Sequence, residues 1–207
     1  QGTLSFGNAV SQLGGILAPG NLILNNANAT QLTYNGSIAS TSNVTINGGG
    51  ALTLVGQNTL ASVTFNNIGG TATPTVTGGT LHVTGSITAT NDNYASSPTI
   101  ESILELNGQT ETLAVNGSSP MGLRLTGVIQ NVMNSATPSG LIKAGNSGLM
   151  LSGASTFAGG VQLNDGTLIL GAASTGTAAG SAVTSGPLGT GALTIAGGTT
   201  LQSDGTA

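Results

Sequence analysis

The residue types that most often carry catalysis or bind metals are scarce in this chain, which has one histidine and no cysteine. The histidine, His82, lies between Leu81 and Val83. On a β-strand it would point to the face opposite these two apolar neighbours. No second histidine or carboxylate cluster accompanies it to complete a metal site, and a Ser-His-Asp triad would depend on this one outward side chain. We therefore interpret His82 as a solvated surface residue.

Three glutamates, Glu101, Glu105 and Glu111, are the next candidates for chemistry. A pair of carboxylates could hydrolyse a glycosidic bond, one as the acid and the other as the base or nucleophile. Glu105 lies between Leu104 and Leu106, so alternation places it on the solvent face. No lysine, arginine or aromatic groove accompanies these acids in the sequence. We interpret all three as solubilising charge.

Metal and phosphate sites are not predicted either. A calcium-binding solenoid repeats its aspartates at every coil, whereas Asp92, Asp165 and Asp204 are scattered. The glycine runs at 48–50 and 78–79 precede strand-like segments, so they lack the helix N-terminus that a phosphate cradle uses. We predict no catalytic residue, no cofactor and no metal, and therefore no enzymatic activity.

Composition restricts the partners further. The 207 residues include 2 Lys+Arg and 6 Asp+Glu, for a net charge of −4. Two basic residues cannot neutralise a phosphate backbone or hold an anionic membrane surface, so we expect no nucleic-acid binding and no membrane association. No apolar run reaches the roughly 18 residues of a membrane-spanning helix. Because the sequence begins with Gln1 rather than Met, we expect it to be processed or to belong to something longer.

Apolar and small polar residues alternate along most of the chain, for example at 44–46, 52–54, 161–163 and 193–195. A period of two is that of a strand with one buried face. The runs are short and are bounded by Gly, Asn, Ser or Asp, which favour turns. The 35 glycines oppose helix formation. The pattern predicts an all-β fold with almost no α-helix.

An internal repeat indicates how the strands are arranged. Segment 50–65 recurs at 148–163, and insertions between the copies fall in turns while the alternating runs stay intact. Stacked coils have this property, because their loops vary and their inward positions cannot. We predict one continuous right-handed parallel β-helix (β-solenoid) over 1–207, with about ten coils of roughly 20 residues. The inward side chains would include Leu52, Leu54, Leu149, Leu151, Val161, Leu163, Leu168 and Leu170, and the outward face would carry Thr, Ser and Asn.

The last third of the chain carries the most specific pattern. It has a Lys-x-Gly start at 143–145, a Leu-x-Leu-Ser-Gly step at 149–153, Gly-Gly at 159–160 and Gly-Thr-Leu at 166–168. Residues 141–201 resemble the autotransporter-associated β-strand repeat, although Ser155 stands where that family usually has Asn and Phe157 where Tyr is common. The resemblance implies a surface-exposed or secreted bacterial β-helix, usually the passenger stalk of a very long polypeptide. It implies no catalytic residue.

Three functions follow from this pattern. The first is structural, a stalk, fibre or sheath segment of an extracellular or outer-surface bacterial protein. The alternative is an adhesin passenger that binds glycans or host proteins through inserted loops. The candidate loops are 90–99, with Asn91, Asp92, Asn93 and Tyr94, and 131–140, and Tyr94 could stack on a sugar. The third, a polysaccharide lyase or hydrolase, lacks a recognisable catalytic set.

Neither end of the sequence has the polar or helical cap that usually closes a solenoid. Segment 2–6 already alternates, and 199–207 reads as the close of a coil and its turn. We expect the rod to continue through both ends, either within one giant chain or by end-to-end stacking of copies.

Overall fold

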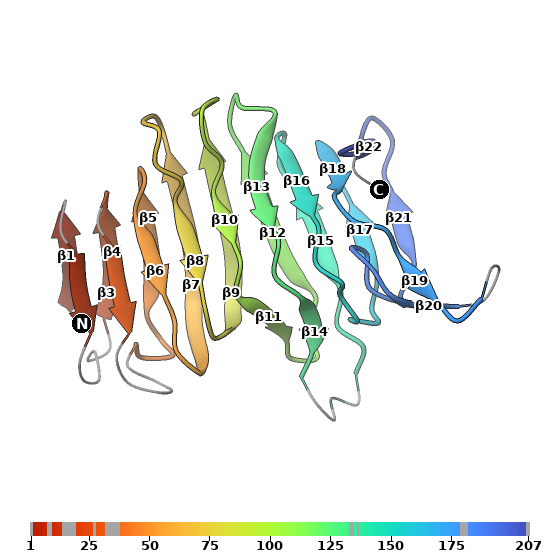
Figure 1. Cartoon of the computed structure of the whole chain (residues 1–207), viewed down its shortest axis with the longest axis horizontal. Helices are drawn as coiled ribbons and strands as arrows, with labels where there is room; N and C mark the ends of the chain where they lie inside the picture. The colour runs from red at the N-terminus through yellow and green to blue at the C-terminus, as the bar shows by residue number, and fades with distance from the viewer. Residues whose placement is uncertain are drawn as a thin grey trace.

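The computed structural model describes residues 2–7, 10–13, 20–26, 28–31, 38–132, 135, 137–178 and 182–205, and the side chains of these residues from 20 onwards except 28–31. Every regular element in these ranges is a β-strand. The strands follow one another in chain order along the long axis of the molecule (Figure 1). The prediction of an all-β fold is confirmed for the described residues.

Two large sheets with parallel pairing contain almost all of the described strands. The first sheet contains, in spatial order, β1 (Gly2–Gly7), β3 (Gly20–Asn25), β5 (Asn43–Asn47), β7 (Gln57–Asn67), β9 (Thr80–Asn91), β12 (Glu111–Asn116), β15 (Leu141–Ala144), β17 (Val161–Leu163) and β21 (Leu193–Ile195), with β11 (Ile103–Leu106) and β14 (Ile129–Asn131) off this path. The second sheet contains β2 (Val10–Leu13), β4 (Asn28–Gln31), β6 (Ala51–Thr53), β8 (Thr75–Thr77), β10 (Thr99–Ile100), β13 (Met121–Leu125), β16 (Gly148–Leu151), β18 (Thr167–Leu170) and β22 (Thr200–Ser203). A separate antiparallel pair is formed by β19 (Thr175–Gly176) and β20 (Val183–Ser185).

The chain passes between the two sheets at almost every step. Up to β10, odd-numbered strands lie in the first sheet and even-numbered strands in the second. Parallel neighbours cannot be joined by a tight hairpin, and here the strand in the other sheet forms the crossover between them. From β3 to β10, each strand therefore pairs with the strand two positions earlier in the chain, as β5 pairs with β3 in the register of Val44 with Leu22.

A third, shorter ladder branches from the first sheet at its long strands. Strands β7 and β9 have a register shift between Leu60 and Ser62. Before the shift, the Thr80 end of β9 pairs with β11, which pairs in turn with β14. After it, the Ser86 end of β9 pairs with β12. One long strand thus contributes to two ladders that diverge in the middle of the molecule.

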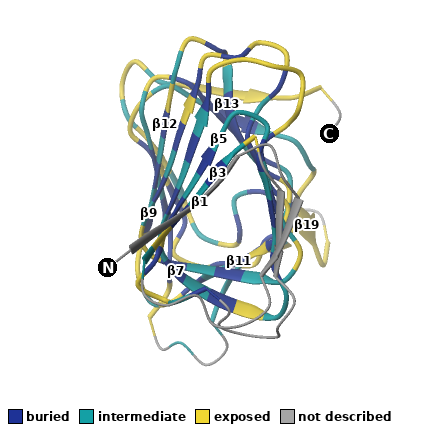
Figure 2. Ribbon diagram, turned by 90° about the vertical axis from the view of Figure 1, so that its left-hand side faces the viewer, coloured by how far each residue is buried: buried dark blue, intermediate teal, exposed yellow. Residues whose placement is uncertain are grey.

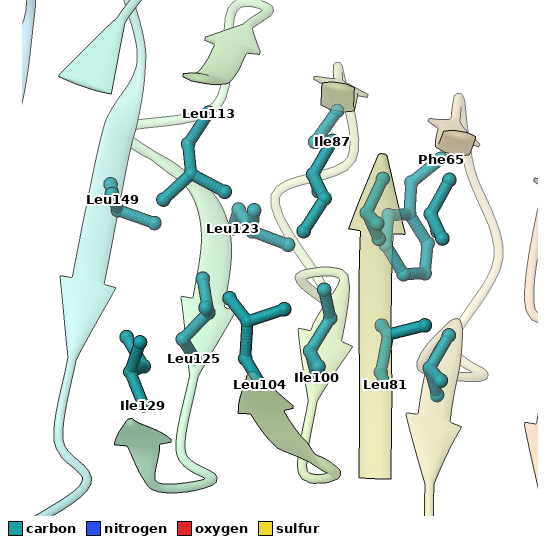
Figure 3. Close-up of a cluster of buried hydrophobic side chains, with 14 of the residues drawn as sticks. Phe65, Leu81, Ile87, Ile100, Leu104, Leu113, Leu123, Leu125, Ile129 and Leu149 are labelled. Carbon is teal, nitrogen blue, oxygen red and sulfur yellow. The ribbon is translucent and has the colours of Figure 1, made fainter. Parts of the chain in front are cut away.

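Parallel register stacks equivalent side chains into columns that fill the interior. In the first sheet one column contains Leu22, Val44, Val63, Ile87 and Leu113, and in the second sheet another contains Leu52, Val76, Ile100, Leu125 and Leu151. All of these side chains are buried. Figure 3 shows Ile87, Leu113 and Leu123 directed into the same interior. Buried residues lie mainly along the strands, and exposed residues are concentrated in the turns (Figure 2).

The predicted inward register is confirmed. Seven of the eight named side chains are at most 2% exposed, namely Leu52, Leu54, Leu149, Leu151, Val161, Leu163 and Leu168. The eighth, Leu170, is partly buried and packs against the same cluster.

Met150 and Ile169 depart from the simple alternation. They are in register with Arg124 on the outward face of the second sheet, yet they are only 5% and 4% exposed. Both lie against glycine backbone: Met150 Cε occupies the place that a Cβ on Gly171 would need, and Ile169 Cδ1 is 3.2 Å from the position of a Cβ on Gly148. The missing side chains at these two glycines leave the space in which the outward apolar groups pack.

The outward face carries ladders of amide and hydroxyl groups, as expected. Asn47 Nδ2 donates to Asn25 Oδ1 at 2.7 Å, and Asn66 Nδ2 donates to Asn47 Oδ1 at 2.9 Å. Thr88 Oγ1 donates to Thr64 Oγ1 at 3.0 Å. These bonds join successive layers, so uncharged polar groups satisfy one another along the stack.

The inward register predicts the effect of a charge in a column. Leu151→Asp should unfold the protein or destabilise it by more than about 4 kcal/mol, because it buries a carboxylate without a partner. Gln162→Asp places the same charge at an exposed position between two inward residues and should cost less than about 1 kcal/mol. Urea denaturation of the two variants measures the difference. Equal midpoints would show that the register of β16 is wrong by one residue.

Candidate functional site

His82 and Glu105 lie next to each other on the third ladder. The His82 side chain contacts the backbone of Glu105 and not its carboxylate. His82 is half-buried on the outward face of β9, and its Nδ1 lies 2.9 Å from the carbonyl oxygen of Glu105. A carbonyl only accepts, so Nδ1 carries the proton in this contact. The Glu105 carboxylate accepts from Gln130 Nε2 at 3.1 Å. Both residues line a small pocket of about 150 Å³, where His82 serves to join two layers.

Glu111 corrects the prediction that all three glutamates solubilise the surface. Glu101 is exposed, but Glu111 is only 6% exposed, because it lies in phase with the inward Leu113 and Val115 of β12. Burial raises the pKa of Glu111 to about 7, opposed by a backbone hydrogen bond with Ile87. Its Oε1 has no hydrogen-bond partner among the described residues. The period of two from Leu113 back to Glu111 was the signal that could have identified it.

Lys143 is a second buried charge, at an inward position that the sequence analysis did not single out. It is 0% exposed and stands between Leu113 and Leu163 in an otherwise apolar column. Its Nζ donates to the carbonyl oxygens of Ala144 at 3.0 Å, Gly145 at 2.5 Å and Asp165 at 3.0 Å. Burial lowers its pKa to about 8, and the nearby charge of Asp165 opposes this. With all three donors used, the ammonium group joins the turns that follow β15 and β17.

The loop at 90–99, the main candidate for ligand binding, is fastened to the body of the protein by buried asparagines. Asn67 Nδ2 donates to Asn91 Oδ1 at 2.9 Å, and Asn91 Nδ2 donates to the carbonyl oxygen of Met121 at 2.6 Å. Asn93 Nδ2 donates to Asn67 Oδ1 at 3.1 Å and to Ser96 Oγ at 2.9 Å. The expectation of a projecting insertion is therefore wrong for Asn91, Asn93 and Ser96, which are buried and hydrogen-bonded.

Other residues of the same loop do face solvent, among them Asp92 and Tyr94. Tyr94 is 73% exposed, and its hydroxyl donates to the carbonyl oxygen of Ser118 at 2.7 Å. Asp92 Oδ1 accepts from Ser118 N at 2.8 Å and from Ser118 Oγ at 3.0 Å. The aromatic ring is thus presented to solvent in a fixed position.

A polar pocket of about 320 Å³ lies between this loop and the outward face of the second sheet. It is lined by Thr73, Tyr94, Ala95, Ser96, Ser97, Thr99 and Arg124. Arg124 comes from β13 and is in register with Thr99 of β10 and Met150 of β16. The sequence analysis identified Tyr94 but not Arg124, whose only signal was its outward position between Leu123 and Leu125.

The second predicted loop, 131–140, is described only in part, since residues 133, 134 and 136 lie outside the described residues. Ser139 in it is buried, donates to the carbonyl oxygen of Leu106 at 3.2 Å and accepts from the backbone N–H of Gly108 at 2.8 Å. This end of the loop is therefore fixed to the turn after β11.

Comparisons with protein-family models, with curated proteins and with solved structures find no match to this chain. The described residues contain no group of three or more His, Cys, Asp or Glu side chains that could hold a metal ion. They also contain no helix of the length and hydropathy needed to cross a membrane.

Burial of Glu111 predicts a specific pH dependence. Between pH 4.5 and about 7 the carboxyl is ionised in the unfolded chain but protonated in the folded one. The free energy of unfolding should therefore fall by about 1–2 kcal/mol as the pH rises through this window. Glu111→Gln should remove this contribution and be more stable than the parent at pH 7.5, measured by urea denaturation at pH 4.5, 6 and 7.5.

Glu101→Gln is the matched control, because Glu101 is exposed. It should keep the slope of the parent. Identical pH profiles for the two variants would contradict the assignment of the slope to Glu111.

Proposed function

We propose that this chain is a structural segment of an extracellular β-solenoid, a right-handed parallel β-helix of about ten coils that forms a stalk, fibre or sheath at a bacterial surface or in a secreted protein. The observation that carries the proposal is the continuity of its columns. Apolar inward columns and uncharged polar outward ladders pass from layer to layer across the described part of the chain. A scaffold of this kind spans a distance and needs no binding or catalytic site to do so.

The connectivity supports this interpretation. Alternation between two parallel sheets, with a third ladder from β9 to β14, is what coils of two or three short strands require. The resemblance of 141–201 to autotransporter-associated repeats favours a bacterial outer surface or secreted location. No catalytic role is included, because His82, Glu105, Glu111 and Lys143 each have a place in the packing rather than in a shared site.

The last layer favours self-association end to end. Ile195 of β21 and Leu201 of β22 continue inward columns but are 49% and 41% exposed. Among the described strands, β21 pairs only with β17 and β22 only with β18, so each has a free edge. Further coils of a longer chain would cover both side chains and satisfy both edges, and so would a second copy stacked on this face, as we propose for the 207-residue chain. A net charge of −4 opposes such stacking only weakly.

The stacking proposal predicts concentration-dependent filaments or end-mediated oligomers of this 207-residue chain in light scattering and electron microscopy. The double variant Ile195→Glu, Leu201→Glu should stay monomeric, because it places charge on the apolar ends of two columns. Thr194→Glu, Gln202→Glu is the control, with the same charges on the outward face of the same strands. A monodisperse monomer of the parent at high concentration would overturn the stacking proposal.

The fixed exposure of Tyr94 beside a polar pocket favours a second candidate function, an adhesin that binds glycans through the loop at 90–99. The polar lining suits sugars, and host proteins are the other partner class.

On a glycan array the parent should bind a subset of glycans, and Tyr94→Ala should lose that binding because the aromatic platform is removed. Ile68→Ala removes a side chain that is 79% exposed and does not line this pocket, and it should leave the binding unchanged. If the parent binds no glycan on the array, the adhesin function is rejected and only the structural function remains.

A further inference from the structure

We propose that the pocket around Arg124 binds the carboxylate of an acidic sugar, a uronic acid residue of a polysaccharide. The proposal rests on the second candidate function and names its ligand class. The proposal rests on the hydrogen bonding in this pocket. The guanidinium of Arg124 has no partner among the described residues, and the hydroxyl groups of Ser97 and Thr99 beside it donate their protons to backbone carbonyl oxygens.

Arg124 is the unpaired cation. It is half-buried, and its guanidinium makes no hydrogen bond or ion pair with any residue in the described part of the chain. Its neighbours in register are a threonine, Thr99, and a methionine, Met150, so no carboxylate lies beside it in the ladder. A guanidinium presents parallel N–H groups in a fork that matches the two oxygens of a carboxylate. The pocket therefore offers a strong donor set for one planar anion.

The hydroxyl groups of the pocket define the rest of the ligand. Ser97 Oγ donates to the carbonyl oxygen of Met121 at 3.1 Å, and Thr99 Oγ1 donates to the carbonyl oxygen of Ser97 at 3.1 Å. With their protons engaged, both oxygens present lone pairs to the pocket. A ligand must then supply O–H donors near its carboxylate. Sugar acids have this combination, whereas a simple fatty or aromatic acid lacks the hydroxyl groups.

Size and rigidity agree with a sugar. A volume of about 320 Å³ is at the lower end of the range for small-molecule sites and suits one or two sugar rings. The exposed ring of Tyr94 forms one wall and can stack on a sugar face. The hydrogen bonds of Asn91, Asn93 and Tyr94 hold the loop in place, so little ordering is required on binding.

The charge of the pocket suits one carboxylate at a time, as in a uronic acid that has a single carboxylate on each ring, and disfavours ligands with several charged groups on one ring. The chain has two basic residues, and the other one, Lys143, is fully buried with its donors engaged. One guanidinium can pair with one carboxylate, and the net charge of −4 repels heavily sulfated or phosphorylated polymers.

The test is a calorimetric titration of the parent and three variants with a trimer of galacturonic acid. The parent should bind with a dissociation constant in the millimolar range or below. Arg124→Gln should bind at least about tenfold more weakly, since the charged fork is lost while the side-chain length is nearly kept. Gln109→Glu changes the net charge equally at an exposed position outside the pocket and should bind like the parent. Tyr94→Ala should also bind more weakly.

Three results would overturn the proposal. They are no binding by the parent at about 10 mM trimer, equal binding by Arg124→Gln, and equal binding of neutral galactotriose. Competition by inorganic sulfate at the concentration of the trimer would show a simple anion site and would overturn it as well. Binding that depends on Tyr94 but not on Arg124 would keep the glycan-binding function and reject the acidic ligand.

Discussion

The register between parallel neighbours is the constraint on which the rest of this structure depends. Backbone hydrogen bonds from one strand to the next place each side chain over its equivalent in the previous layer. An inward position must therefore be apolar in layer after layer, or must carry its own polar partners. The column from Leu22 to Leu113 meets the first condition, and the stacked pair Asn67 and Asn91 meets the second. Outward positions obey the same rule with amides and hydroxyl groups, which explains how so long a surface needs so few charges.

Two ionisable groups in these columns show how strict the rule is. Lys143 interrupts an apolar column, but its ammonium donates to the carbonyl oxygens of Ala144, Gly145 and Asp165. Glu111 has no comparable set, since one of its oxygens is unpartnered among the described residues and its pKa is raised to about 7. Burial disfavours the charged form of both groups, yet only the lysine is compensated by hydrogen bonds. The lysine therefore joins layers, and the glutamate makes stability depend on pH.

Much of this fold was predictable from the sequence, because apolar and polar residues alternate in a strand that has one inward and one outward face. The segments at 149–151 and 161–163 are inward at the positions that a period of two predicts. At Glu111 the same period predicts an inward position while the charge of the side chain predicts an exposed one, because glutamate is rarely buried, and the structure follows the period. The prediction for the loop at 90–99 was wrong for a different reason. Asparagine favours turns in any sequence, and the buried hydrogen bonds of these asparagines join residues 24 to 30 positions apart. Long-range partners of this kind leave no local pattern.

The near-neutral surface gives the Arg124 pocket its significance. On a highly charged protein one arginine would be screened by neighbouring carboxylates or would be one of many cations. Here the described ladder places Thr99 and Met150 beside it, and the only other basic side chain is withdrawn into the core. The repeated structure therefore isolates this guanidinium, and it does so beside a loop whose buried asparagines fix the backbone and whose Tyr94 ring faces solvent. A scaffold of stacked layers can carry a loop of this kind without loss of order, because the columns beneath it are fixed by register and do not depend on what the loop presents to solvent.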